Sequence, residues 1–460
     1  MKESKTIERR SQIFLLIIGA SAAASVILIL ASSWPQQMIA ALLMSGLILL
    51  AAFKPTWSLY LMALTLPIIN WSFPFDGLLI PLADLVALLS LIGYASGQIF
   101  TFLFDRKNFK LSWPFLGSFT IFFVATLISS IFAEYPLASA WYSVRWILFF
   151  YVAFIWMPIN IITNRTILKR TIICLVIAGL AVALIGLTSL SAQDWQNSFA
   201  RIKPTKMFGG YPIGENQNLI AEFLVILVFL TIALKQFVSG EQLKKWLNVI
   251  TLLFAAVAVG TFSRAGWIAL YFQSFMYLVY HRKELIRRYF LPIIIMVMIA
   301  APLSFYMLEL QVETNTSSTE SRLQLSRVAW ESFLEHPIIG TGSGSYVSLV
   351  DNNIRFKAQY GDPLDSHGLW QKVLAENGLL GIITFSIFAF LIFKRLFEGI
   401  TKNPAARNIL IPIVLAVSGG FVFQFFNTSY YKGKLWFPIA LALAAVSLAS
   451  SSKLTHEKVK

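Results

Sequence analysis

The chain has 460 residues, of which 57% are hydrophobic and only 13% are charged, and its formal net charge is +15. Apolar runs of 18 or more residues recur from end to end, and a helix of that length spans the ~30 Å hydrocarbon core of a bilayer. This composition predicts an all-α, polytopic integral membrane protein. A transmembrane β-barrel is excluded, because runs such as 121–130 and 291–303 are apolar on every side and do not alternate.

The chain has 37 lysines and arginines but only 22 acidic residues. In a soluble protein this excess of positive charge would suggest nucleic-acid binding. Here most of the cations lie in short loops between apolar runs, so we expect no nucleic-acid partner. The single cysteine, Cys174, lies within an apolar run, which leaves neither an internal disulfide nor a cysteine-based metal site.

Fourteen apolar runs are expected to form spanning helices, with an uncertainty of two, so that about 12–14 are predicted. They lie at about 13–31, 36–53, 57–73, 79–104, 113–133, 145–162, 171–190, 216–234, 246–262, 264–280, 289–308, 368–393, 408–428 and 435–451. The first run follows a basic segment, as the core of a signal peptide does, but no cleavage site follows it. We therefore interpret it as the first spanning helix.

The distribution of cations predicts how the helices are oriented. With the amino terminus inside, 25 of the 37 lysines and arginines fall in inner segments, as the positive-inside rule requires. Both termini are then cytoplasmic, and the long polar segment lies outside. We expect an N-terminal transmembrane helix bundle (1–308), an extracytoplasmic, periplasmic loop (309–367) and C-terminal transmembrane helices (368–460).

Two outer segments are longer than turns. The first, 191–215, carries Arg201, Lys203 and Lys206, and three outward cations so close together suggest an anionic partner. In the second, Ser317 with Glu320 fits a capping box that opens an amphipathic helix on the outer face of the membrane. The apolar residues at helical spacing in this helix are Leu323, Trp330 and Phe333.

His367 is the candidate catalytic base, because it stands in a polar run just before the twelfth spanning helix. A neutral imidazole can take a proton from an attacking hydroxyl near neutral pH. The alternative is an interfacial histidine that only forms hydrogen bonds. His336 and His367 have no carboxylate at ligand spacing, so we expect no metal site.

Arg264 and Arg145 are expected at the outer edge of the membrane. Charged side chains are costly in this position and usually face a polar cavity, although snorkelling to the lipid head groups is the alternative. The planar fork of arginine suits the oxygens of a diphosphate, and it cannot lose its charge.

Four segments then occur in an order that resembles the O-antigen ligase and O-antigen polymerase superfamily of bacterial membrane glycosyltransferases. They are Thr261-Phe-Ser-Arg-Ala-Gly266, Glu320-Ser-Arg322, His336-Pro-Ile-Ile-Gly-Thr-Gly342 and His367-Gly-Leu-Trp-Gln-Lys-Val-Leu-Ala-Glu376-Asn-Gly-Leu-Leu-Gly381. The resemblance covers about a quarter of the chain. Gly368 departs from it, because the family often has asparagine after the histidine.

The resemblance implies transfer of a glycan from undecaprenyl diphosphate to a hydroxyl, without metal or other cofactor, at the bacterial inner membrane. His367 would activate the hydroxyl, and Arg264 and Arg322 would hold the diphosphate. The acceptor would be lipid A core or a growing polysaccharide, and membrane lipids would surround the protein. Further substrate-binding residues are expected at Arg145, Arg201, Lys203, Lys206, Asn218 and Glu376.

A flippase or transporter for lipid-linked sugars is the alternative function. Such a protein is expected to carry charged or broken helices in corresponding positions of two halves. Asp84 and Glu222 are the candidate membrane acids, and the sequence has no such symmetry. The choice between ligation, polymerisation and transfer to another acceptor stays open.

Overall fold

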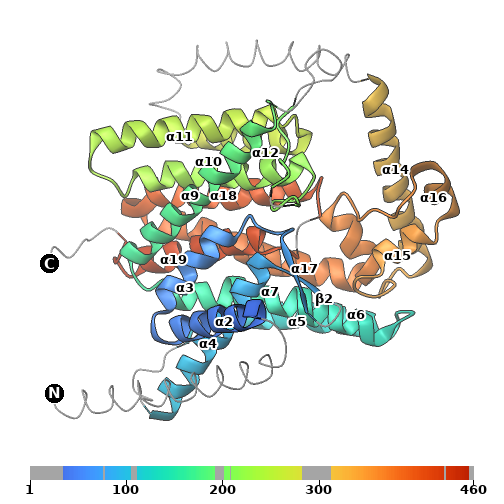
Figure 1. Cartoon of the computed structure of the whole chain (residues 1–460), viewed down its shortest axis with the longest axis horizontal. Coiled ribbons are helices and arrows are strands. Elements are labelled where there is room, and N and C mark those ends of the chain that lie inside the picture. The colour runs from blue at the N-terminus through green and yellow to red at the C-terminus, as the bar shows by residue number, and fades with distance from the viewer. Residues whose placement is uncertain are drawn as a thin grey trace.

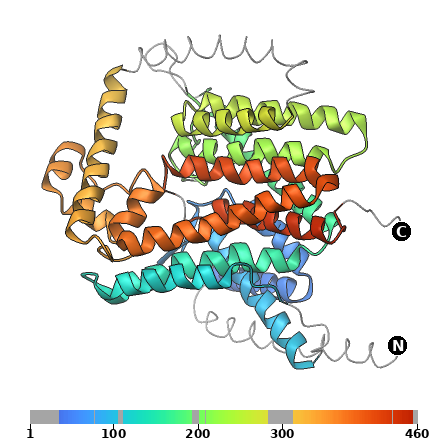
Figure 2. The same cartoon turned by 180° about the vertical axis from the view of Figure 1, so that it is seen from behind.

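The computed structural model describes residues 35–75, 78–104, 111–191, 201–207, 209–281, 312–428 and 431–454. In this part of the chain, long helices lie side by side, and three further helices are grouped at one end of them (Figure 1). We call this the loop end; it is on the right in Figure 1 and on the left in Figure 2. Its helices are α14 (Val312–Glu335), α15 (Tyr346–Asp351) and α16 (Ile354–Tyr360).

The remaining helices form the bundle. They are α2 (Pro35–Phe53), α3 (Pro55–Thr65), α4 (Leu82–Phe104), α5 (Leu116–Ile131), α6 (Pro136–Tyr142), the π-helix η1 (Ser143–Leu148), α7 (Phe149–Tyr151), the π-helix η2 (Val152–Trp156), α8 (Met157–Ile161), α9 (Arg165–Thr188), α10 (Gln217–Lys235), α11 (Glu241–Gly260), α12 (Arg264–Tyr280), α17 (Leu369–Lys402), the 3₁₀-helix η3 (Pro404–Ala406), α18 (Arg407–Gln424) and α19 (Gly433–Ser450). The elements α6 to α8 form one continuous helix.

The prediction of an all-α, polytopic membrane protein is confirmed. In the part of the chain that the structure describes, eight helices are long and apolar enough to cross a membrane, and two apolar helices are shorter. The expected spans 13–31 and 289–308 lie outside the described residues. Each of the other expected spans falls on a helix, at least in part.

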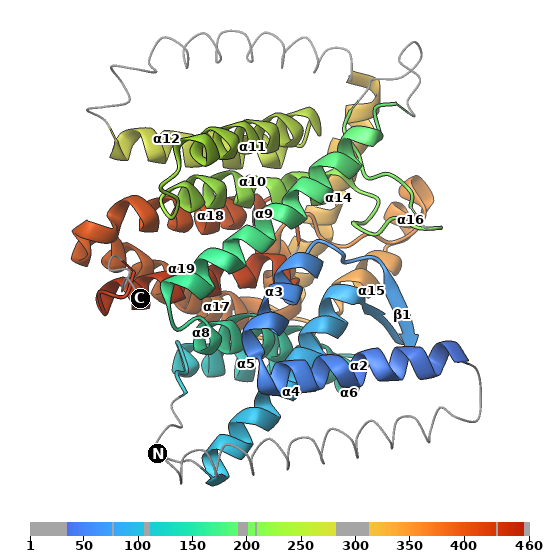
Figure 3. The same ribbon diagram turned by 60° about the vertical axis from the view of Figure 1, so that its left-hand side comes forward.

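One expected span, 57–73, is wrong in its second half. Helix α3 ends at Thr65, and after it β1 (Ser72–Phe75) pairs antiparallel with β2 (Leu78–Pro81). Proline has no N–H group to donate, and Pro67 lies just after α3 within this expected span. The hairpin, of which β1 is labelled in Figure 3, links α3 to α4.

The centre of the bundle is formed by α10, α18 and α19, whose membrane-spanning windows are each more than four-fifths buried inside the protein. Polar and small side chains fasten these helices to their neighbours, as is usual where lipid is as apolar as the interior. Gln273 of α12 is fully buried and donates to the carbonyl oxygens of Leu415 (2.9 Å) and Val225 (3.3 Å). A Cβ on Gly419 would lie 2.0 Å from the amide of Gln273, so only glycine permits this contact.

The amphipathic helix expected in the loop is present as α14, but its buried face differs from the expected one. The buried residues Leu325, Val328 and Ala329 pack with α15 and α16 in a small hydrophobic core. Leu323 and Trp330 are each 54% exposed and lie on the opposite side. The helix also begins before the capping box, at Val312. Apolar spacing identified the helix, but the sequence contains two apolar faces and does not distinguish them.

Candidate active site

Helix α17 breaks at Gly378, whose backbone angles are φ 58° and ψ −157°. The segment that follows α14 lies against this break and supplies hydrogen-bond partners to both sides of it. The N–H groups of Leu379 and Leu380 donate to the carbonyl oxygens of Pro337 (2.9 Å) and Ile338 (3.0 Å). In the other direction, the N–H of Gly342 donates to the carbonyl oxygen of Glu376 (2.8 Å).

This arrangement explains why two of the motifs occur together in the sequence. The run from His336 to Gly342 and the run from Glu376 to Gly381 are paired backbone to backbone, so neither can form its structure alone. The hydroxyl of Ser129 in α5 also donates to the Glu376 carbonyl oxygen (2.6 Å), which attaches the pair to the bundle. We call the pair, 336–342 with 376–381, the paired-loop module.

The turn that carries His367 is held on both sides. The hydroxyl of Ser366 donates to the carbonyl oxygen of Gly368 (2.7 Å), and the N–H of Gly368 donates back to that hydroxyl (3.1 Å). The hydroxyl of Thr428, just after α18, donates to the carbonyl oxygen of Ser366. A Cβ on Gly368 would lie 3.1 Å from the carbonyl oxygen of Phe425. The position at which glycine replaces the asparagine of the resembled family is therefore one where the chain passes close to another backbone.

The imidazole of His367 is electrically neutral at ordinary pH. Burial lowers its pKa to about 4, and the positive charge of Arg322 acts in the same direction, while Asp365 opposes them. Among the residues that the structure describes, none forms a hydrogen bond with the imidazole. A neutral histidine of this kind can accept a proton from a substrate hydroxyl.

Arg322 of α14 and Arg264 at the start of α12 lie close enough for their charges to interact. Burial lowers the pKa of Arg322, and the charge of Arg264 lowers it further. The Nε of Arg322 is buried without a hydrogen-bond partner, and neither arginine forms an ion pair within the described ranges. Two neighbouring cations without a carboxylate are suited to an anionic ligand with more than one charge.

Lys372 lies at the centre of a buried ionic cluster one helical turn from the His367 turn. It is 2% exposed, and its Nζ lies 2.6 Å from Asp365 Oδ1 and 3.5 Å from Glu376 Oε1. The hydroxyl of Tyr431 donates to Asp365 Oδ2 (2.7 Å), and burial raises the pKa of Tyr431 well above its usual value. The cluster fixes Asp365, two residues before His367.

The predicted site residue Glu376 is fully buried in this cluster, where its Oε1 also accepts from the N–H of Tyr346 (3.2 Å). Its partners are therefore protein groups. Sequence reasoning did not single out Lys372 or Tyr431. The i, i+4 spacing of Lys372 and Glu376 was the available signal, since oppositely charged residues at this spacing are neighbours on a helix.

A second buried ionic cluster lies around Glu222 of α10. Its carboxylate is ion-paired with Lys434 of α19 and accepts from the side-chain amides of Gln424 (2.7 Å) and Asn427 (3.2 Å). Asn218, a predicted site residue, is buried one helical turn before Glu222. The cluster joins the loop-end termini of three helices.

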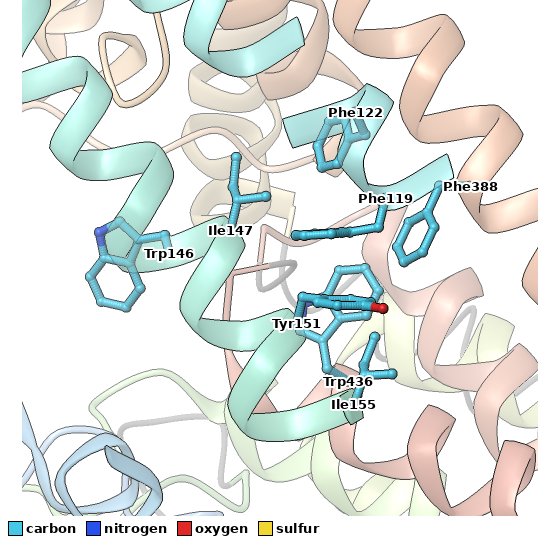
Figure 4. Close-up of a pocket in the computed structure, with 8 residues that line it drawn as sticks. All are labelled: Phe119, Phe122, Trp146, Ile147, Tyr151, Ile155, Phe388 and Trp436. Carbon is cyan, nitrogen blue, oxygen red and sulfur yellow. The ribbon is translucent and has the colours of Figure 1, made fainter. Parts of the chain in front are cut away.

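Arg145 lies on η1 next to the hairpin. Its Nη2 donates to the carbonyl oxygen of Leu79 in β2 (3.1 Å), and its guanidinium stands 4.6 Å from the ring centre of Trp146. Beside it, an aromatic group packs η1 and η2 against α5, α17 and α19 (Figure 4). Phe119 and Tyr151 stack there with ring centres 3.8 Å apart. The cavity among these rings is only about 10 Å³, so it holds no substrate.

The remaining predicted cations, Arg201, Lys203 and Lys206, are exposed on the segment 201–207. The N–H of Ile202 donates to the carbonyl oxygen of Gly260 at the end of α11 (2.8 Å). This bond places the segment beside the turn that leads to Arg264. The structure thus brings Arg264, Arg322 and His367 together, with Arg201 and Lys203 on a neighbouring segment.

Comparison with protein families agrees with this geometry. The family model described as O-antigen ligase matches residues 249–386, which contain Arg264, Arg322, His367 and the paired-loop module. A comparison with curated proteins finds no match. The chain thus carries, at residues 249–386, the domain of the O-antigen ligase superfamily.

Proposed function

We propose that this protein is a metal-independent glycosyltransferase of the O-antigen ligase or polymerase type. It moves a glycan from undecaprenyl diphosphate to a hydroxyl of lipid A core or of a growing polysaccharide. The observation that carries the proposal is the neutral His367 beside Arg264 and Arg322, two cations that no carboxylate neutralises in the described chain. The family match supports the same class of reaction.

In the proposed reaction, His367 takes the proton of the acceptor hydroxyl while the oxygen attacks the anomeric carbon of the donor sugar. The bond from that carbon to the diphosphate oxygen breaks, and the leaving undecaprenyl diphosphate gains negative charge. Arg264 and Arg322 stabilise this charge more strongly in the transition state than in the ground state. The imidazolium then returns its proton to the solvent or to the leaving group.

The other predicted residues receive different roles. Arg201, Lys203 and Lys206 are exposed beside Arg264 and attract the anionic donor. We assign Glu376 to positioning, since its carboxylate is buried against Lys372. Arg145 and Asn218 support the surrounding structure near the substrate.

The proposal also includes an orientation in the cell. The loop end, with the segment 309–367, faces outward from the bacterial cytoplasmic membrane, and both termini are cytoplasmic. The segments 1–308 and 368–460 form the membrane part. Positive-inside counting supports this orientation, because the segments that it assigns to the cytoplasm carry 25 of the 37 lysines and arginines.

The test is a transfer assay with purified protein in detergent, a lipid-linked glycan and separate candidate acceptors. We expect one acceptor to be extended, in EDTA as well as without it. His367→Ala should lower turnover by ~10²-fold or more with donor binding retained, since only the proton transfer is lost. The matched control is His336→Ala, an exposed histidine of the same loop. Wild-type turnover in His367→Ala would disprove the base assignment.

A further inference from the structure

Gln371 lies in the first turn of α17, shortly after His367, and its side chain reaches across to α14. Its Nε2 donates to the hydroxyl of Ser326 (2.8 Å). That hydroxyl in turn donates to the carbonyl oxygen of Arg322, one helical turn earlier on α14 (2.8 Å). Two consecutive hydrogen bonds thus connect the start of α17, next to the His367 turn, with the backbone of Arg322.

The direction of these bonds fixes the orientation of the Gln371 amide. Because the carbonyl oxygen of Arg322 takes the hydrogen of the Ser326 hydroxyl, the amide has to present its NH₂ group to that hydroxyl. The Oε1 atom of Gln371 is then left buried without a donor in the described chain. A buried acceptor without a partner is costly, so stability alone does not account for an amide at this position.

The position of Arg322 depends on how its backbone is held. The apolar residues that pack α14 into its small hydrophobic core, Leu325, Val328 and Ala329, all follow Arg322 in the sequence. The Nε of Arg322 is buried without a hydrogen-bond partner among the residues described. The carbonyl oxygen of Arg322, by contrast, is the end point of the hydrogen bonds that begin at Gln371.

The spacing between Arg322 and His367 matters for the reaction proposed above. The acceptor hydroxyl lies at His367 and the leaving diphosphate at Arg322, with the anomeric carbon between them. A misplacement of about 1 Å in such an arrangement can lower the rate by ~10²-fold.

We propose that Gln371 is a positioning residue that fixes Arg322 relative to the His367 turn through Ser326. The catalytic roles of His367 and Arg322 in this inference rest on the proposed function. The link between α17 and α14 does not, and it can be measured without transfer.

The first test is the transfer assay with Gln371→Met, which keeps the length of the side chain and removes the hydrogen bond. We expect a kcat about tenfold lower, with the KM of donor and acceptor within about twofold of wild type, because each substrate still meets its own partner. The thermal midpoint should stay near that of wild type, since the unpaired Oε1 is lost together with the bond. Gln359→Met is the matched control, as an exposed glutamine on α16.

Ser326→Ala breaks the same hydrogen bond from α14, so the test does not depend on the folding of one variant. If both residues act through this bond, the double variant Gln371→Met/Ser326→Ala should be no slower than the slower single variant. Losses of kcat that multiply in the double variant would give the two residues separate roles and overturn the proposal. A wild-type kcat in the folded single variants would overturn it as well.

The second test is NMR spectroscopy of histidine-labelled protein in detergent, in which His367→Ala identifies the signal of His367. The positive charge of Arg322 lowers the pKa of His367. Gln371→Met and Ser326→Ala hold Arg322 less firmly, so both should raise this pKa, whereas Gln359→Met should not. An unchanged pKa of His367 in both variants would overturn the proposal. A raised pKa, in a protein whose wild type transfers no glycan, would disprove the proposed function and retain the link.

Discussion

Gly340 and Gly378 lie so close together that a Cβ on Gly378 would stand 2.8 Å from the backbone nitrogen of Gly340. A Cβ on Gly340 would stand 2.4 Å from the carbonyl carbon and oxygen of Glu376. Both glycines have positive φ, at 70° and 58°. The break in α17 therefore depends on two backbones that meet without side chains between them.

Gly340→Ala and Gly378→Ala should each destabilise the protein by more than the cost of holding an alanine at positive φ. Overpacking of this kind costs about 1–3 kcal/mol beyond the strain of a left-handed residue. Gly361→Ala is the matched control, because Gly361 also has positive φ (79°), but no atom of the described chain lies within 4 Å of the place that its Cβ would take. Thermal unfolding in detergent measures the difference, and equal midpoints for Gly378→Ala and Gly361→Ala would contradict the prediction.

The pH dependence of turnover should reflect the low pKa of His367. Because the imidazole accepts a proton only when neutral, turnover should fall with decreasing pH near the pKa of about 4. Arg322→Gln should move this acidic limb to higher pH, since the removed cation no longer opposes protonation. The acidic limb of Arg322→Gln should still lie below pH 6.5, because burial lowers the pKa of His367 more than the charge of Arg322 does.

Arg327→Gln provides the control, as an exposed arginine on the same helix. Its acidic limb should match that of the wild type. An acidic limb in Arg322→Gln that is the same as in wild type would show that the charge of Arg322 does not reach His367.

Arg264→Lys should be damaging although it keeps the charge. A lysine cannot make the two parallel hydrogen bonds that arginine offers to a diphosphate. We expect weaker donor binding and slower single-turnover transfer, with a thermal midpoint near that of wild type. Arg355→Lys, on the exposed face of α16, should change neither. Loss of folded protein in Arg264→Lys would instead give this arginine a structural role.

Lys372→Met should destabilise the protein strongly. It leaves Glu376, which is fully buried, and Asp365 without their cation, and such a loss typically costs about 3–5 kcal/mol. The double variant Lys372→Met/Glu376→Gln should regain part of the loss. By contrast, Lys402→Met removes an exposed pair with Glu398 and should change the stability little. Denaturation in detergent compares the three, and a Lys372→Met midpoint equal to that of Lys402→Met would show that the cluster contributes little.

The orientation of the loop end can be tested by labelling in a Cys174→Ser background. Ile354 is 83% exposed on α16, so Ile354→Cys should react with a membrane-impermeant maleimide in intact spheroplasts. Lys402→Cys, at the opposite end of α17, should react only after permeabilisation. The reverse pattern would place the proposed site on the cytoplasmic side.

Much of the fold follows from the sequence, because long apolar runs in a membrane protein can satisfy their backbone hydrogen bonds only as helices. The order of the motifs and the scarcity of polar residues also mark His367, Arg264 and Arg322 as candidates from the sequence alone. The hairpin at Ser72–Pro81 was missed, since the apolar run before it looked long enough to span.

The pairing of distant groups could not be derived in this way. Glu222 in α10 and Lys434 in α19 are far apart in the sequence, yet they form one buried ion pair. Periodicity does not reveal which helices are central, because lipid and protein interior are both apolar and give α10 and α11 the same kind of sequence. Burial, and with it the assignment of Glu376 to the interior, is decided by packing between helices, which no single segment encodes.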